Sequence, residues 1–274
     1  MSNLRVQALH VHPVKSVAGT APDEAAVEPW GMSGDRRWAV VDTEGTVITQ
    51  RQHPRLALAA ARPLGGGAIA LSAPGMAELA VEVPEPGPLE PVTLFGKKVE
   101  TVVAASAAAD WFSAYLGVPA RLVHLDDPAV RRPVDPAYAL PGETVSLADA
   151  YPVLLVTLAS LDALNSLIAQ GDHPEEGPLS MNRFRPNVVV AGAEAWAEDG
   201  WRRIAIGDAV FRGVRECGRC IVTTTDQATA ERGKEPLKTL ALHRRIGKSL
   251  AFGRQLVPVR TGTVRVGDEV RVLE

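Results

Sequence analysis

The sequence predicts a β-rich α+β protein, in which a β-barrel or sandwich carries a few helices. Short alternating or β-branched runs, separated by turns rich in glycine and proline, greatly outnumber runs with helical periodicity. The regular alternation of strands and helices that is typical of a parallel sheet is not expected. With 274 residues and 46% hydrophobic content, the chain is long enough for one large domain or two ordinary ones. These observations favour two β-rich halves.

The first half is predicted to consist mainly of strands. We interpret the triplet Gly65 to Gly67 as a turn and not as a phosphate loop, because an alternating strand follows it and not a helix. Helical periodicity first occurs at Ser106 to Leu116, with Ser106 as the expected N-cap and Gly117 as the stop. Strands are expected at residues 5–10, 37–42, 46–49, 68–72, 78–83, 91–95, 98–103 and 118–125.

The second half begins after a proline-rich stretch at residues 126–146, which has the composition of a loop and the length of a lid or linker. We therefore expect domains at residues 1–124 and 125–274. The apolar run Tyr151 to Val156 predicts a buried strand, and the leucines that follow it predict a helix ending near Gly171. Strands are expected at residues 187–191, 203–206, 209–214, 221–225, 256–260 and 263–273, and a short helix at 237–245.

The charge and the N-terminal sequence exclude several classes of function. A formal net charge of −3 offers no basic surface for nucleic acid or an acidic membrane, so an anionic ligand needs a local cluster of cations. The N-terminus lacks the features of a signal peptide, and no apolar run approaches the roughly 20 residues of a membrane span. We therefore expect a cytoplasmic protein that binds neither nucleic acid nor membrane.

Cys217 and Cys220 are the only cysteines, so a disulfide framework does not hold this fold together. A redox dithiol needs its cysteine at a helix start, but residues 221–225 predict a strand. Structural zinc needs four ligands, and no second CxxC or histidine pair completes that set. A single thiolate could instead bind a softer transition metal. Two small buried side chains are an equally common outcome for a cytosolic CxxC pair.

Three basic segments could bind an anion: residues 12–16, 34–38 and 182–187. Lysine supplies a point charge, serine a hydroxyl donor and arginine a planar fork, and together these groups suit a phosphate. Taken singly, each segment is more often a solvated surface turn.

Four segments in order resemble the MOSC family of molybdenum cofactor proteins: residues 13–16 (PVKS), 35–38 (DRRW), 183–187 (RFRPN) and 217–226 (CGRCIVTTTD). Shorter matches elsewhere extend the resemblance over nearly the whole chain; they lie at residues 51–55, 197–201, 235–240 and 262–268. The resemblance is closest to the two-part arrangement of an N-terminal MOSC β-barrel domain packed on a MOSC β-barrel domain with a few helices. That arrangement is found in the mitochondrial amidoxime-reducing component and its bacterial relatives.

The resemblance implies a molybdenum–molybdopterin cofactor and assigns roles to particular residues. Cys220 matches the thiolate that binds molybdenum, whereas Cys217 matches a position that is not a ligand. Asp226 matches an acid beside the metal, with a turn-forming aspartate as an equal alternative. The positions that match cofactor contacts are Lys15, Ser16, Arg36, Thr157, Arg185, Asn187, Gly218 and Arg219. A simple N-cap explains Thr157 equally well, and Gly218 stands where relatives often have a hydroxyl residue.

The implied activity is reduction of N-hydroxylated compounds, such as amidoximes, N-hydroxylated bases and hydroxylamines. The chain carries no ferredoxin-like domain with four cysteines, so electrons are expected from a separate donor protein. That donor would be ferredoxin-like, or cytochrome b5-like with a reductase. An alternative is a molybdenum cofactor or sulfur carrier in which Cys220 accepts a persulfide. A third interpretation is a β-barrel interaction module whose cysteines are buried and inert.

Overall fold

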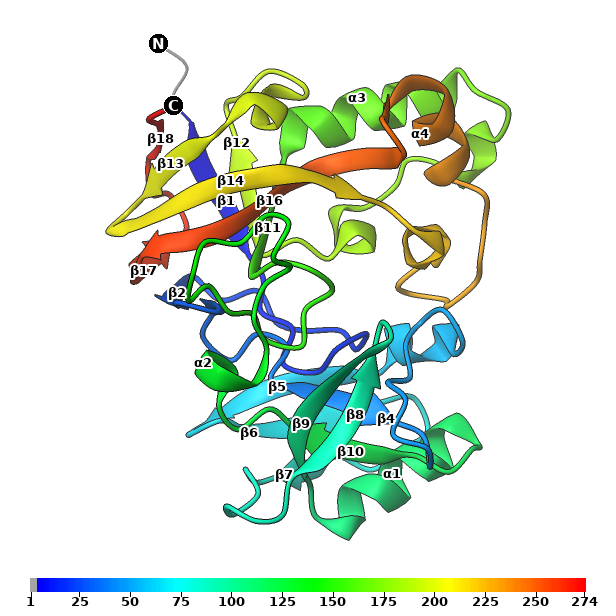
Figure 1. The fold of residues 1–274 in the computed structure, drawn as a ribbon. Helices are drawn as coiled ribbons and strands as arrows, with labels where there is room; N and C mark the ends of the chain where they lie inside the picture. The colour runs from blue at the N-terminus through cyan, green and yellow to red at the C-terminus, as the bar shows by residue number, and fades with distance from the viewer. Residues whose placement is uncertain (1–3) are drawn as a thin grey trace.

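The computed structural model describes residues 4–274, which form two lobes stacked one above the other in Figure 1. The strands are β1 (Arg5–Leu9), β2 (Glu24–Glu28), β3 (Gly31–Met32), β4 (Trp38–Val41), β5 (Ala60–Gly65), β6 (Ala68–Ser72), β7 (Leu79–Val81), β8 (Glu90–Leu94), β9 (Lys97–Val103), β10 (Arg121–His124), β11 (Val153–Thr157), β12 (Val188–Ala191), β13 (Arg203–Ile206), β14 (Ala209–Gly218), β15 (Arg245–Ile246), β16 (Ser249–Arg260), β17 (Gly262–Arg265) and β18 (Val270–Val272). The α-helices are α1 (Ser106–Leu116), α2 (Pro128–Arg131), α3 (Leu158–Ala169) and α4 (Leu237–His243). The β-rich α+β class expected from the sequence is confirmed.

The upper lobe is built on a nearly closed barrel sheet. Its strands follow the order β1-β12-β11-β16-β14-β13-β18, and β15 pairs with β16 at the side. An antiparallel bridge between Arg5 and Glu269 brings the segment before β18 beside β1, which nearly closes the sheet. The first strand of the chain thus lies in a barrel made otherwise by the second half, as the blue β1 among the yellow and orange strands of Figure 1 shows.

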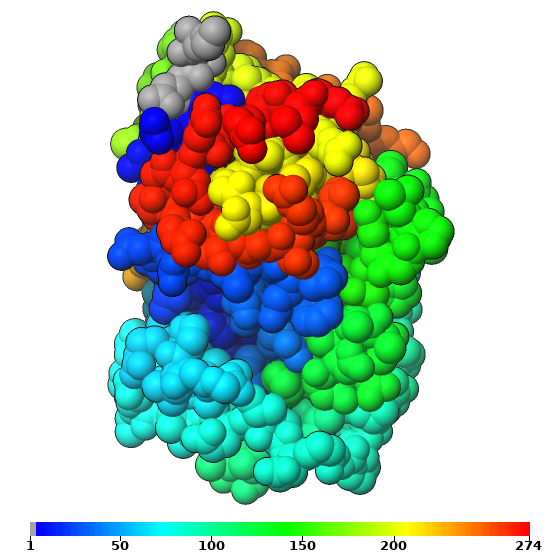
Figure 2. All heavy atoms as spheres, turned by 90° about the vertical axis from the view of Figure 1, so that its left-hand side faces the viewer, coloured from blue at the N-terminus to red at the C-terminus, as the bar shows by residue number. Residues whose placement is uncertain are grey.

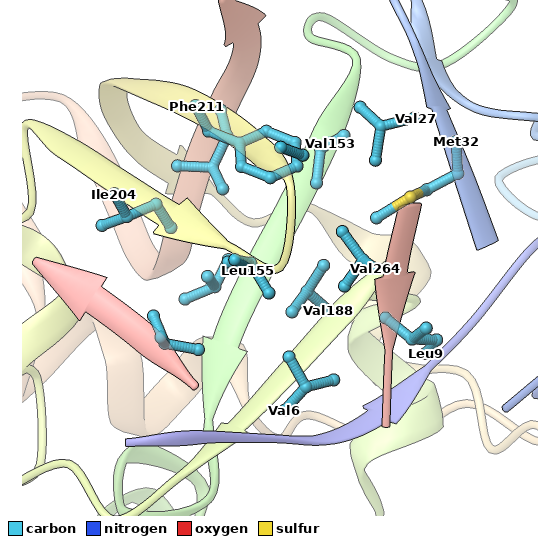
Figure 3. Close-up of a cluster of buried hydrophobic side chains, with 14 of the residues drawn as sticks. Val6, Leu9, Val27, Met32, Val153, Leu155, Val188, Ile204, Phe211 and Val264 are labelled. Carbon is cyan, nitrogen blue, oxygen red and sulfur yellow. The ribbon is translucent and has the colours of Figure 1, made fainter. Parts of the chain in front are cut away.

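The core of this barrel combines side chains from both ends of the chain. Val6 and Leu9 of β1 are buried with Leu155 of β11 and Phe211 of β14, and Val27 of β2 is buried with them (Figure 3). Burying an aliphatic or aromatic side chain of this size stabilises a fold by about 1.5–3 kcal/mol. The first strands therefore contribute to the stability of the upper lobe.

The lower lobe contains two smaller sheets, with orders β4-β10-β9-β8 and β5-β6-β7. Helix α1 buries Trp111, Phe112 and Tyr115 against them. The helix has the predicted bounds and ends at Gly117, which adopts the left-handed conformation at φ 71°. The expected cap at Ser106 is wrong, because the N-cap position is Ala105, and no side chain caps the helix there.

The segment between β10 and β11, residues 125–152, connects the lobes. Leu125 accepts two hydrogen bonds from Arg37, at 3.0 Å from Nε and 2.6 Å from Nη2, and Leu147 N donates to Arg36 O at 2.9 Å. In Figure 2 this green stretch runs down one side of the molecule and covers both lobes. It is an ordered strap with one short helix, α2, and not a loose linker.

Three further local expectations are wrong. Residues 221–225 do not form a strand, because Cys220 O accepts from both Thr223 N (3.0 Å) and Thr223 Oγ1 (2.9 Å), which closes a 3₁₀ turn at Ile221–Thr224. Residues 46–49 make only isolated bridges. A parallel βαβ unit does occur, since β11 and β12 are parallel neighbours joined through α3. Among the described residues, no helix is long and apolar enough to cross a membrane.

Candidate functional site

A cavity of about 320 Å³ lies where the two lobes meet. The lower lobe contributes Arg51 and Phe95, and the loop between β1 and β2 contributes Lys15 and Ser16. The upper lobe and the strap supply the remaining wall, which includes Asp149, Tyr151, Leu154, Arg183, Arg185, Asn187, Cys217, Gly218, Arg219, Cys220, Thr223 and Gln255. Neither lobe forms the cavity alone.

Lys15 lies at the buried side of the cavity and is only 3% exposed. Its Nζ donates to Leu147 O at 3.0 Å and pairs with the carboxylate of Asp149. Burial lowers the pKa of Lys15 to about 8, although Asp149 raises it, and the charges of Arg132 and Arg36 lower it further. The ammonium group is therefore charged at neutral pH.

Arg36 and Arg185 form a pair of cations held by backbone carbonyls. Arg36 Nη2 donates to Arg185 O at 3.0 Å, and Arg185 Nη2 donates to Val17 O at 2.8 Å. Burial, and then the charge of Arg36, lower the pKa of Arg185 to about 9. Asn187 links the two segments, because its Oδ1 accepts from Arg36 Nη1 at 3.3 Å and from Leu154 N at 3.1 Å. Arg36 Nη1 also pairs with Asp35 Oδ2 at 2.5 Å, whereas Arg185 forms no ion pair with a carboxylate among residues 4–274.

The two cysteines are free and line the cavity from different positions. Cys217 is buried one residue before the end of β14, and Arg219 Nη1 lies 2.9 Å from its sulfur. Cys220 is partly exposed at the start of the 3₁₀ turn, and Arg51 Nη2 lies 3.2 Å from its sulfur. Cys220 is therefore the thiol that a ligand in the cavity can reach more easily.

The charge of the cavity differs from that of the whole chain. Six cationic side chains line it, against the single carboxylate of Asp149. They are Lys15, Arg36, Arg51, Arg183, Arg185 and Arg219. The chain as a whole carries a net charge of −3. Such a local excess of positive charge is suited to an anionic ligand.

Comparisons with known proteins agree along the whole chain. The MOSC N-terminal beta barrel domain matches residues 3–119, and the MOSC domain matches residues 142–271. The human mitochondrial amidoxime-reducing component 1 is 35% identical over 286 residues, which cover 98% of this chain and 82% of the human protein. The chain belongs to the amidoxime-reducing component family of MOSC proteins. The component 1 of Xenopus laevis is 32% identical, with 97% of this chain and 81% of that protein covered. The crystal structure of the YUAD protein from Bacillus subtilis covers 98% of this chain and 94% of that one, at 12% identity and a TM-score of 0.44.

In this MOSC protein, most residues singled out from the sequence meet at the cavity. Those that line it are Lys15, Ser16, Arg36, Arg185, Asn187, Gly218, Arg219 and Cys220. They come from four stretches that are far apart in the sequence, so folding brings them together.

Thr157 and Asp226 do not line the cavity. The Thr157 hydroxyl is buried at the start of α3, where it accepts from Ser160 N at 3.2 Å and donates to Glu198 Oε2 at 3.1 Å. It acts as the N-cap of that helix. Asp226 accepts from the backbone N–H groups of Ala228 and Thr229 at 2.8 and 3.0 Å and pairs with Arg183 at 2.9 Å. The structure thus places Asp226 as a turn former that positions Arg183.

Sequence reasoning missed several side chains that line the cavity, among them Arg51, Phe95 and Asp149. Arg51 belongs to residues 51–55, one of the shorter segments that resemble the family, so the sequence did contain a signal for its place in the site. Phe95 was assigned to a strand and Asp149 to the region after a loop, and no local pattern connects either of them with Cys220. Their proximity depends on how the lobes pack.

Proposed function

We propose that this protein is a molybdenum cofactor-dependent reductase of N-hydroxylated compounds, among them amidoximes, N-hydroxylated bases and hydroxylamines. The observation that carries the proposal is one cavity that combines a reachable thiol, Cys220, with six cationic side chains. A molybdopterin cofactor has an anionic phosphate, which the cationic side chains can bind. Its metal needs a soft ligand, which the Cys220 thiolate can supply.

The unsatisfied polar atoms of the cavity also fit such a group. Arg183 and Arg219 each keep a buried Nε without a hydrogen-bond partner among residues 4–274. Buried donors of this kind are costly unless a ligand or water completes them. An anionic cofactor with several oxygen and nitrogen acceptors would lower that cost.

Each residue would have a separate task in the loaded protein. Lys15, Ser16 and Arg36 would hold the anionic end of the cofactor, and Arg185, Asn187 and Arg219 would contact its polar edge. Cys220 would bind the metal, and Arg51 would donate a hydrogen bond to its sulfur. Cys217 would stay an acceptor for Arg219 and not a ligand.

The overall reaction needs two electrons and two protons. An amidoxime, R–C(NH₂)=N–OH, takes up 2 e⁻ and 2 H⁺ and yields the amidine R–C(NH₂)=NH and water, so the N–O bond breaks. The cofactor, when bound, supplies the two-electron chemistry. The residues of the chain orient the cofactor and shape the cavity in which the N–O bond meets it. The electrons would come from a separate donor protein, ferredoxin-like or cytochrome b5-like with its reductase.

The test compares Cys220→Ala with Cys217→Ala, expressed in a host that makes the cofactor and is supplied with molybdate. We expect a molybdenum-to-protein ratio near one in the wild type and loss of metal and benzamidoxime reduction in Cys220→Ala. Cys217→Ala should keep most of both. Equal behaviour of the two variants would contradict the proposed ligand.

The alternative carrier function has a separate readout. Acid–iodine treatment converts a bound molybdopterin to a fluorescent pterin, whereas a protein that only carries a persulfide on Cys220 releases none. If the folded protein contains no molybdenum or pterin but carries a persulfide on Cys220, the reductase function is contradicted and the sulfur-carrier function is supported.

A further inference from the structure

The turn between β8 and β9 carries an unusual residue. Leu94 pairs with Lys97, which leaves a two-residue loop of Phe95 and Gly96. Both loop residues have positive φ, 51° and 76°, as a type I′ turn requires. Asparagine and glycine adopt this conformation readily, but a bulky aromatic residue there is an outlier. The hairpin thus has phenylalanine at a position where the required backbone conformation is unfavourable for it.

The side chain of Phe95 faces the cavity between the lobes. It is 52% exposed and lines the cavity, with Lys15 Nζ 5.2 Å and the Arg51 guanidinium carbon 5.0 Å from its ring centroid. The same guanidinium donates to Cys220 Sγ at 3.2 Å. A single guanidinium group therefore contacts both the ring and the Cys220 thiol. In Figure 1 the β8–β9 turn lies at the top of the lower lobe and points at the upper lobe.

The ring is much more exposed than the cations suited to an anionic cofactor, although Lys15 Nζ lies within 5.2 Å of its centroid. Lys15, Arg183 and Arg185 are each less than a tenth exposed and form the floor of the cavity, whereas Phe95 stands half exposed at its rim. The exposed half of the ring is open to a molecule that enters the cavity after a cofactor has bound to the buried cations. That molecule is the substrate.

We propose that Phe95 is a specificity-determining residue whose ring forms the aromatic wall of the substrate site. It would favour substrates whose N-hydroxylated group is attached to a flat aromatic ring. This inference rests on the proposed reductase function and adds a substrate preference to it. Aromatic rings prefer offset-stacked or edge-to-face contacts, and the free energy of such a pair corresponds to a factor of roughly two to ten in an equilibrium constant.

The decisive variant is Phe95→Asn, because asparagine suits positive φ and removes the ring without disturbing the turn. Wild type and variant are compared as molybdenum-loaded proteins with reduced viologen as electron donor, so no donor protein is needed. Benzamidoxime and acetamidoxime serve as the aromatic and aliphatic substrates. We expect kcat/KM for benzamidoxime to fall roughly two- to tenfold, with acetamidoxime unchanged and the thermal unfolding midpoint unchanged or higher.

Two further variants make the comparison specific. Phe95→Tyr keeps the ring and should keep the preference for benzamidoxime. Leu64→Asn removes an exposed apolar side chain from β5, which does not line the cavity, and should change neither substrate. Equal losses for both substrates in Phe95→Asn, or no loss, would overturn the proposal.

A binding measurement separates this proposal from the proposed function. If the wild type reduces neither substrate, the reductase function is contradicted, but calorimetric titration with benzamidoxime and acetamidoxime still tests the aromatic wall. Weaker binding of benzamidoxime alone to Phe95→Asn supports the role of the ring. Benzamidoxime that binds both proteins equally, or neither, contradicts it.

Discussion

Backbone strain in this protein is concentrated at the cavity. Six residues other than glycine have positive φ among residues 4–274, and four of them line the cavity: Ser16, Arg36, Phe95 and Arg185. Each such residue costs roughly 1 kcal/mol or more and persists only where the surrounding structure enforces it. Three of the four belong to the cofactor contacts inferred from the family resemblance, so the strain and the resemblance point to the same place.

Lys15 makes anion binding at this cavity dependent on pH. Its pKa is lowered to about 8, so the ammonium group loses its proton as the pH rises past that value, and its attraction for an anion is lost with it. We expect the affinity of the cofactor-free protein for inorganic pyrophosphate to fall roughly tenfold between pH 7 and 9. Isothermal titration calorimetry at both pH values measures this change.

Two lysine variants distinguish the buried group from surface charge. Lys15→Met should bind pyrophosphate weakly at pH 7 and show little further loss near pH 8. Lys98→Met, on the exposed side of β9, should keep the wild-type pH profile. An unchanged profile in Lys15→Met would mean that another group controls binding.

Within single elements, close backbone approach determines the position of the loop between β1 and β2. Val11 and Thr20 exchange hydrogen bonds of 3.0 and 2.9 Å and close a loop that presents Lys15 and Ser16. A Cβ on Gly19 would lie 2.0 Å from Val11 O and 2.8 Å from His12 Cα. Only glycine fits at position 19, between the two bridged backbone segments.

Gly19→Ala should therefore destabilise the protein and weaken its anion site together. Overpacking of this kind costs typically about 1–3 kcal/mol, and the loop must move away from the cavity to relieve the contact. Urea unfolding and pyrophosphate titration measure the two effects. Gly200→Ala is the matched control, because nothing lies within 4 Å of a Cβ there. A stable Gly19→Ala protein with normal affinity would show that the loop adapts.

The strand β10 contains a histidine that limits stability in acid. His124 is 5% exposed, packs against Trp38 with the ring centroids 4.4 Å apart and the planes tilted by 48°, and has a buried Nδ1 without a hydrogen-bond partner among residues 4–274. Burial, and then the charge of Arg37, lower its pKa to about 4. The unfolded state, with a pKa near 6.5, binds the proton more readily, so stability is lost as the pH falls from about 6.5 to 4.

Replacing this histidine should flatten the acid limb of the stability profile. Because of the lowered pKa of His124, the free energy of unfolding falls by up to about 3 kcal/mol over that pH range. His124→Phe keeps a ring against Trp38 and removes the titration, so its free energy of unfolding should change less between pH 7 and 4. Urea unfolding at several pH values tests this, with the exposed His243→Asn as control. Parallel profiles for His124→Phe and wild type would assign the acid sensitivity to other groups.

Helices and strands can be predicted from the sequence where the signals that determine them are local. The bounds of α1 are predictable because its apolar spacing and Gly117 are local signals. The strand expected at 221–225 fails because β-branched propensity is overridden by the hydrogen bonds that Thr223 makes to Cys220 O. The parallel pairing of β11 with β12 connects strands about 30 residues apart in the sequence, and no short-range sequence pattern predicts it.

At the scale of the whole molecule, the first strands of the chain pair with strands of its second half. β1 pairs with β12, and β2 pairs with β17, so the first 28 residues complete the sheets of the second half. Pairing over such sequence separations depends on tertiary packing, which composition and periodicity do not encode. The same packing brings Arg51 and Phe95 of the lower lobe to Cys220.

This interlocked arrangement predicts that residues 125–274 do not fold as an independent domain. Without β1 and β2, the barrel would expose the edge of β12 and lose the buried side chains of Val6, Leu9 and Val27. The isolated fragment should show no cooperative unfolding transition by circular dichroism and should bind a hydrophobic dye. Residues 1–36 joined to the fragment by a flexible glycine–serine linker should recover a cooperative transition. Cooperative unfolding of the fragment alone would show instead that the barrel closes without the first strands, and that the division at residue 124 also separates folding units.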